Sequence, residues 1–144
     1  MIEVQEIKTE SQLQDAFDIR RQVFVVEQAV DPAEEYDEFE GSCLHFIASF
    51  KGIASGTCRI RKTENGTKLE RFAVLEKMRG KGIGKALVEA CLNQLRQQTH
   101  TGKIYLHAQE HALGFYAQMG FQAEGERFWE AGIPHFNMHL VSLP

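Results

Sequence analysis

Cysteine is scarce in this sequence, and the few cysteines lie far apart. Cys43, Cys58 and Cys91 are the only three in a chain of 144 residues, and no two of them form a C-x-x-C pair. An odd number of widely spaced cysteines gives neither a disulfide framework nor the thiolate set of a zinc site. We therefore expect three reduced thiols, mostly buried, and no metal site.

Long apolar runs are also missing. No stretch approaches the roughly 20 apolar residues that a membrane-spanning helix needs. Residues 1–6 have neither the basic start nor the apolar core of a signal peptide. We therefore expect no contact with a membrane and predict a cytoplasmic location.

An excess of positive charge is absent as well. The formal net charge is −4 at pH 7, with 16 Lys and Arg residues against 20 Asp and Glu residues. Proteins that bind nucleic acid or anionic lipid usually carry a basic surface, so nucleic acid is not an expected partner. The length suits a single domain over residues 1–144, and no internal repeat interrupts it.

Hydrophobic periodicity predicts a mixed α/β chain in the order β–α–β–β–β–α–β–α–β–β. The first helix should begin at a capping box formed by Ser11 and Gln14, and Asn65-Gly66 should form a type I′ hairpin turn. A helix between the fourth and fifth strands makes these two parallel. The expected strands are residues 2–6, 43–50, 53–61, 67–74, 103–108, 121–129 and 136–140, and the expected later helices are residues 83–95 and 112–119.

The segment of residues 31–40 is strongly acidic. It holds six carboxylates and follows the first expected helix, with Pro32 near its start. We expect a loop or a short irregular helix, and since such runs are usually solvated, a solvated acidic loop is our first interpretation. Attraction of a cationic acceptor is the alternative.

A glycine-rich stretch, Arg79-Gly80-Lys81-Gly82-Ile83-Gly84-Lys85, lies between an expected strand and an expected helix. Glycines let the backbone come close to a ligand. The first backbone N–H groups of a helix have no partner within the helix and lie at its positive end, so this stretch is suited to bind an anion such as a phosphate. The stretch does not fit the dinucleotide-binding motif G-x-G-x-x-G, because the last glycine position falls on Lys85 or Leu87. It does not fit a P-loop either, because Ala86 follows Gly84-Lys85 where that motif has Ser or Thr. A tight packing turn is the alternative.

Two motifs together resemble the GNAT superfamily of acetyl-CoA-dependent N-acyltransferases. The first is Phe72-Ala73-Val74 followed by Arg79-x-x-Gly82-x-Gly84, which is similar to the pyrophosphate loop of that family. The second is Ala112-x-x-Phe115-Tyr116-x-x-x-Gly120-Phe121, after one further expected strand. Either motif alone is weak evidence, whereas their spacing is specific. Arg20-x-x-Val23-Phe24-Val25-Val26-Glu27-Gln28 and Gly132-Ile133-Pro134-His135 resemble its ElaA-like and YjcF-like branch.

The resemblance implies a GNAT-like fold, with a mostly antiparallel sheet whose parallel fourth and fifth strands splay around a coenzyme A cleft. Gln109 departs from the family pattern, in which many members carry asparagine, but glutamine keeps both a donor and an acceptor. The resemblance assigns acetyl-CoA binding to Phe72, Ala73, Val74, Arg79, Gly80, Lys81, Gly82, Gly84, Lys85, Gln109 and Tyr116.

The implied activity is direct transfer of an acetyl group from acetyl-CoA to a primary amine of a small molecule or peptide. Tyr116 would be the general acid that protonates the departing thiolate, and the amide of Val74 would polarise the carbonyl. The general base is not assigned, and Glu27 and His111 are its first candidates. Further candidates by residue type are Glu70, His107 and His135. A sensor module that binds acyl-CoA without turnover is the alternative function.

Overall fold

The computed structural model of the protein describes residues 1–98 and 102–141. In this part of the chain the strands form one seven-stranded sheet in the order β1-β2-β3-β4-β5-β7-β6, antiparallel except for the pair β4–β5. The predicted element order and mixed sheet are confirmed. The helices and strands are β1 (Ile2–Glu6), α1 (Glu10–Arg20), the π-helix η1 (Arg21–Glu27), α2 (Pro32–Glu35), β2 (Leu44–Phe50), β3 (Ile53–Thr63), β4 (Gly66–Val74), α3 (Ile83–Arg96), β5 (Ile104–Gln109), α4 (Leu113–Gln118), β6 (Phe121–Glu130) and β7 (Ile133–Leu140).

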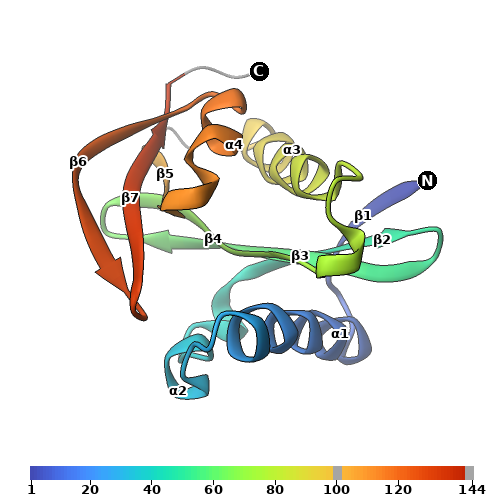
Figure 1. Cartoon of the computed structure of the whole chain (residues 1–144). Coiled ribbons are helices and arrows are strands. Elements are labelled where there is room, and N and C mark those ends of the chain that lie inside the picture. Colours follow the sequence, from blue (N-terminus) through green and yellow to red (C-terminus); the bar gives the residue numbers. More distant parts are fainter. Residues whose placement is uncertain (99–101, 142–144) are drawn as a thin grey trace.

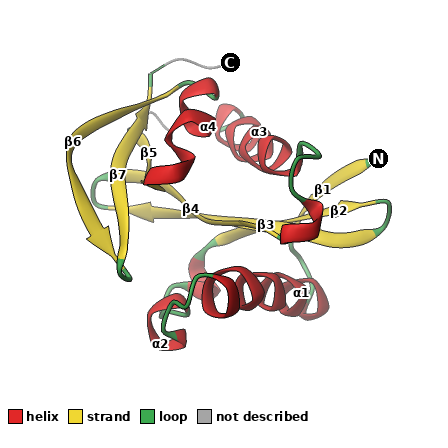
Figure 2. Cartoon of the chain, viewed as in Figure 1, coloured by secondary structure: helices red, strands yellow, loops and turns green. Residues whose placement is uncertain are grey.

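Helices cover both faces of the sheet. Figures 1 and 2 show α1 and α2 on one face and α3 and α4 on the other. The apolar side of α3 forms the larger core, because its buried residues recur at three and four positions, as a helical stripe requires. Gly56 on β3 allows close contact there, since a side chain would meet atoms of Ile83 and Leu87 at 2.9 and 3.1 Å. A smaller core lies beneath α1.

Two local predictions differ from the structure. The capping box uses Thr9 and Gln12 rather than Ser11 and Gln14, so α1 begins at Glu10. The β3–β4 hairpin is confirmed, but Thr63 pairs with Gly66. Its turn residues are therefore one position earlier than predicted. A type I′ turn is also wrong, because neither turn residue, Glu64 or Asn65, has a positive φ.

The β6–β7 turn is shorter than predicted. Ala131 and Gly132 both have positive φ, at 50° and 75°, and make the reversal by themselves. Ile133 and Pro134 already belong to β7 and pair with Glu130 and Trp129. Glu130, Ala131 and Ile133 at the tip of this hairpin line the cavity described below.

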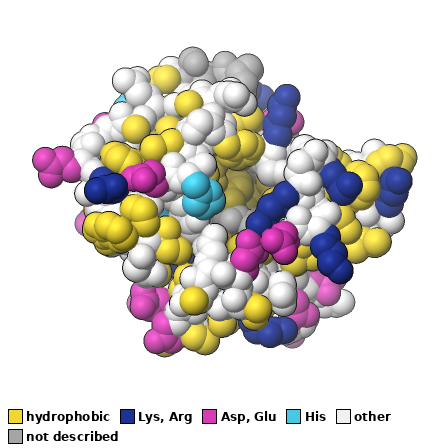
Figure 3. Space-filling model, in the orientation of Figure 1, with side chains coloured by type: hydrophobic (Ala, Val, Ile, Leu, Met, Phe, Trp, Pro, Cys, Tyr) yellow, Lys and Arg dark blue, Asp and Glu magenta, His cyan; other side chains and the backbone are white. Residues whose placement is uncertain are grey.

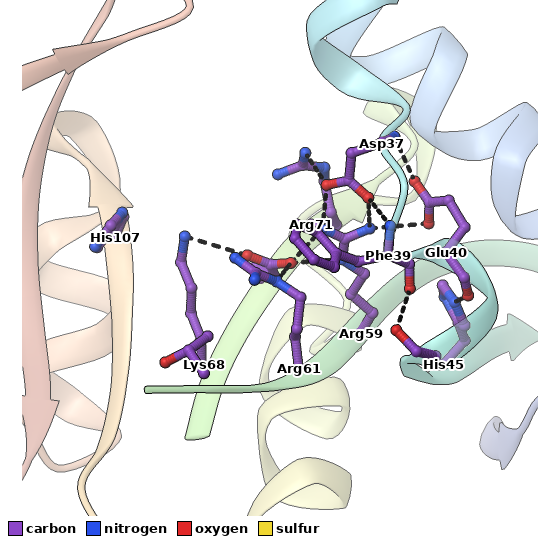
Figure 4. Close-up of polar contacts among 12 residues, drawn as sticks. Asp37, Phe39, Glu40, His45, Arg59, Arg61, Lys68, Arg71 and His107 are labelled. Carbon is purple, nitrogen blue, oxygen red and sulfur yellow. Dashed lines mark hydrogen bonds and ion pairs between the residues drawn. The ribbon is translucent and has the colours of Figure 1, made fainter. Parts of the chain in front are cut away.

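A network of charged side chains joins the α1 side of the molecule to β3 and β4, and we call it the ion network (Figure 4). Arg20 and Arg59 are each 1 % exposed and form its buried centres. Arg20 binds Glu35 at 2.7 Å and Glu40 at 2.6 Å, so the acidic segment is held against the end of α1. The nine members are Arg20, Glu35, Asp37, Glu40, Arg59, Arg61, Lys68, Glu70 and Arg71.

The interpretation of residues 31–40 as a solvated loop is therefore wrong for its central part. Glu35 is 2 % exposed, and Asp37 binds Arg59 at 2.6 Å. The segment is acidic because it supplies the counter-charges of buried arginines. Glu34 and Glu38 in the same segment are exposed.

We expect Arg59→Met to lower the free energy of unfolding by about 3–5 kcal/mol, because it leaves buried carboxylates without their partner. Urea unfolding followed by circular dichroism measures this loss. Arg96→Met is the control, since Arg96 is exposed and bonds only to Asn93 among the described residues; it should change the free energy by less than about 0.5 kcal/mol. Equal effects of the two variants would contradict a central role for Arg59.

The ion network should also make the stability of the fold sensitive to acid below about pH 4.5. Burial alone would raise the pKa of Asp37 and of Glu70, but Arg59 lowers both, to about 2. A carboxyl whose folded pKa is depressed stabilises the fold above its unfolded pKa, near 4, and loses that contribution as the pH falls toward the folded value. The contribution of the ion network to the unfolding free energy should therefore be constant from pH 7 to 5 and fall between about pH 4.5 and 2. Because burial lowers the pKa of His45, its protonation costs stability at higher pH, so the contribution of the network is measured as the difference between the protein and Arg59→Met. A difference that already shrinks above pH 5.5 would contradict this.

Candidate active site

The sheet opens between β4 and β5. These strands pair only at Thr67 with Ile104 and at Lys68 with Tyr105, although β4 continues to Val74 and β5 to Gln109. Each strand keeps its other neighbour, since β4 pairs with β3 and β5 with β7. The last residues of β4 thus present an edge toward β5 that no strand of the described chain covers.

A cavity of about 650 Å³ occupies this opening. That volume is typical of small-molecule sites. Figure 3 shows a hollow in this face of the molecule, with hydrophobic side chains at its bottom and charged side chains and a histidine at its edge. Of the residues predicted for donor binding, Phe72, Ala73, Val74, Arg79, Gln109 and Tyr116 line it.

The glycine stretch lies at the start of α3, beyond these lining residues. Gly80 and Gly82 have φ values of 79° and 90°, a conformation that side chains disfavour. The first hydrogen bond of the helix runs from the amide of Ala86 to the Gly82 oxygen, at 3.1 Å, so the preceding amides have no partner within α3. Free amides at a helix start are what an anion-binding site requires, and anion binding here stays a prediction. The side chain of Lys81 lies over the Phe50 ring, with its Nζ 5.2 Å from the ring centroid.

Arg79 joins this stretch to the end of η1. Its guanidinium donates to both carboxylate oxygens of Glu27, at 2.6 and 2.7 Å, and its Nε donates to the Val74 oxygen at 3.0 Å. The hydrogen bonds from Arg79 lower the pKa of Glu27. A carboxylate with a lowered pKa is a weaker base, so this pairing disfavours Glu27 as the proton acceptor.

The neighbouring residue, Gln28, makes the corresponding contact with β5. The side-chain amides of Gln28 and Gln109 donate to each other, at 3.1 and 2.9 Å. His111 contacts the same Gln109 oxygen at 2.7 Å, and since an amide oxygen only accepts, His111 donates through Nε2. The side chain of Gln109 is thereby held on two sides. Glu27 and Gln28 together link η1 to the glycine stretch and to β5.

Tyr116 is buried at 8 % exposure on α4 and belongs to an aromatic cluster. The ring centroids of Phe72, Phe115 and Phe121 lie 5.8, 5.0 and 6.2 Å from that of Tyr116. Burial raises the pKa of Tyr116, so its hydroxyl keeps its proton at neutral pH. A protonated hydroxyl on a cavity wall meets the first requirement of a general acid.

The opposite part of the cavity carries a histidine and carboxylate pair, of which the sequence analysis named His107 as a candidate base but missed Glu130. His107 on β5 donates through Nδ1 to Glu130 at the end of β6, at 2.9 Å. His135 on β7 lies 3.8 Å from the other oxygen of Glu130. Nε2 of His107 has no hydrogen-bond partner among the described residues and stays available to a ligand. His107, Glu130 and His135 all line the cavity.

Among residues 1–98 and 102–141, no group of His, Cys, Asp and Glu side chains is arranged to hold a metal ion. Cys58 and Cys91 are buried with their sulfurs 3.5 Å apart, and Cys43 is half-buried; all three are free thiols. No helix in the same ranges is both long enough and apolar enough to cross a bilayer.

Comparison with known proteins extends the resemblance. Residues 5–142 match the family model of the acetyltransferase (GNAT) domain. The chain is 38 % identical over 132 residues to the uncharacterised N-acetyltransferase YjcF of Bacillus subtilis, which covers 91 % of this chain and 94 % of that protein. It is 30 % identical over 132 residues to the protein ElaA of Escherichia coli, covering 89 % and 86 %.

Solved structures show the same fold. The crystal structure of Escherichia coli ElaA superposes with a TM-score of 0.85 at 29 % identity, over 98 % of this chain and all of that one. A GNAT family acetyltransferase from Elizabethkingia anophelis, solved with acetyl-CoA bound, gives a TM-score of 0.70 at 19 % identity, over 96 % of this chain and 94 % of that one. At that identity the second likeness concerns the fold alone.

Proposed function

The chain belongs to the GNAT family of acetyltransferases, and we propose that it transfers the acetyl group of acetyl-CoA to a primary amine of a small molecule or peptide. The observation that carries this proposal is a continuous path along the protein. It runs from the free amides at the start of α3, along the uncovered edge of β4, to the cavity beside Tyr116. A pyrophosphate, an extended amide-bearing arm and a thioester occur in that order in acetyl-CoA.

The donor would be held mainly by backbone groups. Amides between Gly82 and Lys85 suit the pyrophosphate, because they point from the positive end of α3 and no side chain of Gly82 covers them. The arm would pair with β4 as an added strand does, since the edge toward β5 is free there. Arg79 adds positive charge once its contacts with Glu27 and Val74 are exchanged for the ligand.

The chemistry requires a neutral amine, a polarised carbonyl and a proton for the departing thiolate. Tyr116 supplies the proton, in a ternary complex with direct attack by the amine. Alternate amides of a strand point to the same edge, so those of Phe72 and Val74 are the candidates to polarise the carbonyl. Of the possible bases, geometry favours His107, because Glu130 holds its Nδ1 and leaves Nε2 free, whereas Glu27 and His111 are engaged by other partners.

Acetyl-CoA and coenzyme A should raise the melting temperature, whereas ATP should not. At a ligand concentration of about 100 times Kd, binding adds ~2.7 kcal/mol, which corresponds to roughly 5–10 °C for a domain of this size. Gly82→Ala should reduce the shift, because a side chain at a φ of 90° distorts the turn. Gly125→Ala is the matched control, with a φ of 77° on β6 outside the cavity lining. No shift with either coenzyme A form would overturn the proposal.

Tyr116→Phe should lower kcat by about 100-fold or more while the acetyl-CoA shift is retained, because only the transferable proton is removed. Release of the coenzyme A thiol measures turnover. Tyr36→Phe is the control: its hydroxyl donates to the Phe17 oxygen at 3.2 Å, and the residue does not line the cavity. Undiminished turnover in Tyr116→Phe would exclude Tyr116 as the acid. A melting shift without thiol release from any amine would instead indicate a sensor of acyl-CoA.

A further inference from the structure

The ion network carries its positive excess at one end. Its nine members comprise five cations and four carboxylates. One half is balanced, with three carboxylates and three guanidinium groups, and it consists of Glu35, Asp37, Glu40, Arg20, Arg59 and Arg71. In the other half, Arg61 and Lys68 share a single carboxylate, that of Glu70, at 3.0 and 3.2 Å.

Glu70 does not neutralise both of these cations. Its side chain is 6 % exposed, and Arg59 binds it as well, so three cations converge on two oxygen atoms. Arg61 and Lys68 have no other carboxylate partner within ion-pair distance among the described residues. The network therefore carries one positive charge more than its own carboxylates balance, on side chains that are mostly shielded from bulk water, where an anion is bound more strongly than at an open surface.

Both cations face the cavity. Arg61 and Lys68 line it from β3 and β4, where they are register partners, and their side chains are 21 % and 13 % exposed. Figure 4 shows Lys68 on the side of the network nearest to His107 on β5. The cavity wall across from Lys68 carries the negative charge of Glu130. Burial alone would raise the pKa of Glu130, but His107 and, to a smaller extent, the positive charge of Lys68 lower it.

The position along β4 sets how far the anion lies from the reacting carbonyl. Lys68 precedes Phe72 by four residues, which is roughly 13 Å along a strand at about 3.3 Å per residue. The ammonium of Lys68 lies at the end of a four-carbon side chain, so the anion need not lie beside the Lys68 backbone. An acceptor that holds its amine toward the reacting carbonyl would carry its second group several bonds away.

We propose that the acceptor is a primary amine that also carries an anionic group, a carboxylate or a phosphate, and that Arg61 and Lys68 bind that group while the amine lies toward His107 and Glu130. This inference rests on the proposed acetyl transfer and names its acceptor class. A diamine of the same length would place an ammonium against Lys68 and is disfavoured. Arg61 and Lys68 are thus specificity-determining residues of the cavity rather than parts of the donor site.

The test compares acceptors of equal length. We expect kcat/KM for 6-aminohexanoate to exceed that for hexylamine and for 1,6-diaminohexane by at least tenfold, and 3-aminopropyl phosphate tests the phosphate as the anion. Lys68→Met should reduce the ratio of kcat/KM for 6-aminohexanoate to kcat/KM for hexylamine at least tenfold, whereas Lys68→Arg should preserve that ratio. Lys103→Met is the control, because Lys103 pairs with Glu124 outside the cavity lining. Equal use of the neutral amine or the diamine, or an unchanged ratio in Lys68→Met, overturns the proposal.

Calorimetry separates failure of this inference from failure of the acetyl transfer. Binding of 6-aminohexanoate and of 3-aminopropyl phosphate is measured on the protein saturated with coenzyme A, so that no turnover is needed. Binding that Lys68→Met weakens at least tenfold supports the anion site even if no acetyl transfer occurs. If acetyl-CoA raises the melting temperature but neither anionic amine binds better than hexylamine, the acceptor class is wrong and donor binding stands.

Discussion

The short pairing between β4 and β5 is the constraint on which the site depends. Backbone donors and acceptors inside a protein need partners, and a sheet normally supplies them by continuous pairing. Here the pairing stops after Lys68, yet both strands stay in place because β3 and β7 hold their other edges, and Leu69 of β4 and Leu106 of β5 belong to the same core as the buried side of α3. The sheet thus contains an uncovered edge in its interior. An extended ligand with amide groups can complete that edge as a strand would.

The ion network fixes the side of this opening that is formed by β3 and β4. Removing charged groups from water costs free energy, so a buried ion network adds little to the stability of the fold. Its larger effect here is to favour one arrangement of the chain. In this protein the arrangement fixes α1 and the acidic segment against β3 and β4, so that Arg61 and Lys68 stay at the cavity. Arg71 contributes at a φ of 59°, in the stretch of β4 where the β3 register shifts, and its guanidinium lies 3.3 Å from Asp37. Strained backbone of this kind is frequent at functional sites.

Much of the fold could be predicted from local signals, because glycine turns and apolar periodicity act over a few residues. The helices predicted at residues 83–95 and 112–119 are examples, since α3 and α4 lie there. Predictions that needed a choice between neighbouring registers failed, as with the cap at Thr9, since Ser11 offers the same chemistry. The ion network was beyond reach for another reason. Its pairs join residues such as Arg20 and Glu40, whose approach depends on the tertiary fold.

The two halves of the cavity differ in how they are encoded. In the proposed function the donor would contact the backbone of two short segments, so that the backbone conformation specifies these contacts and a short sequence motif can reveal them. The proposed acceptor would instead contact side chains on four strands, Arg61, Lys68, His107 and Glu130, which no short motif can reveal. Replacing one of these side chains changes the charge of the cavity without moving the edge of β4. A family with this construction can keep one donor and alter its acceptor by single substitutions, which is why the charges of the cavity, rather than the fold, identify the substrate.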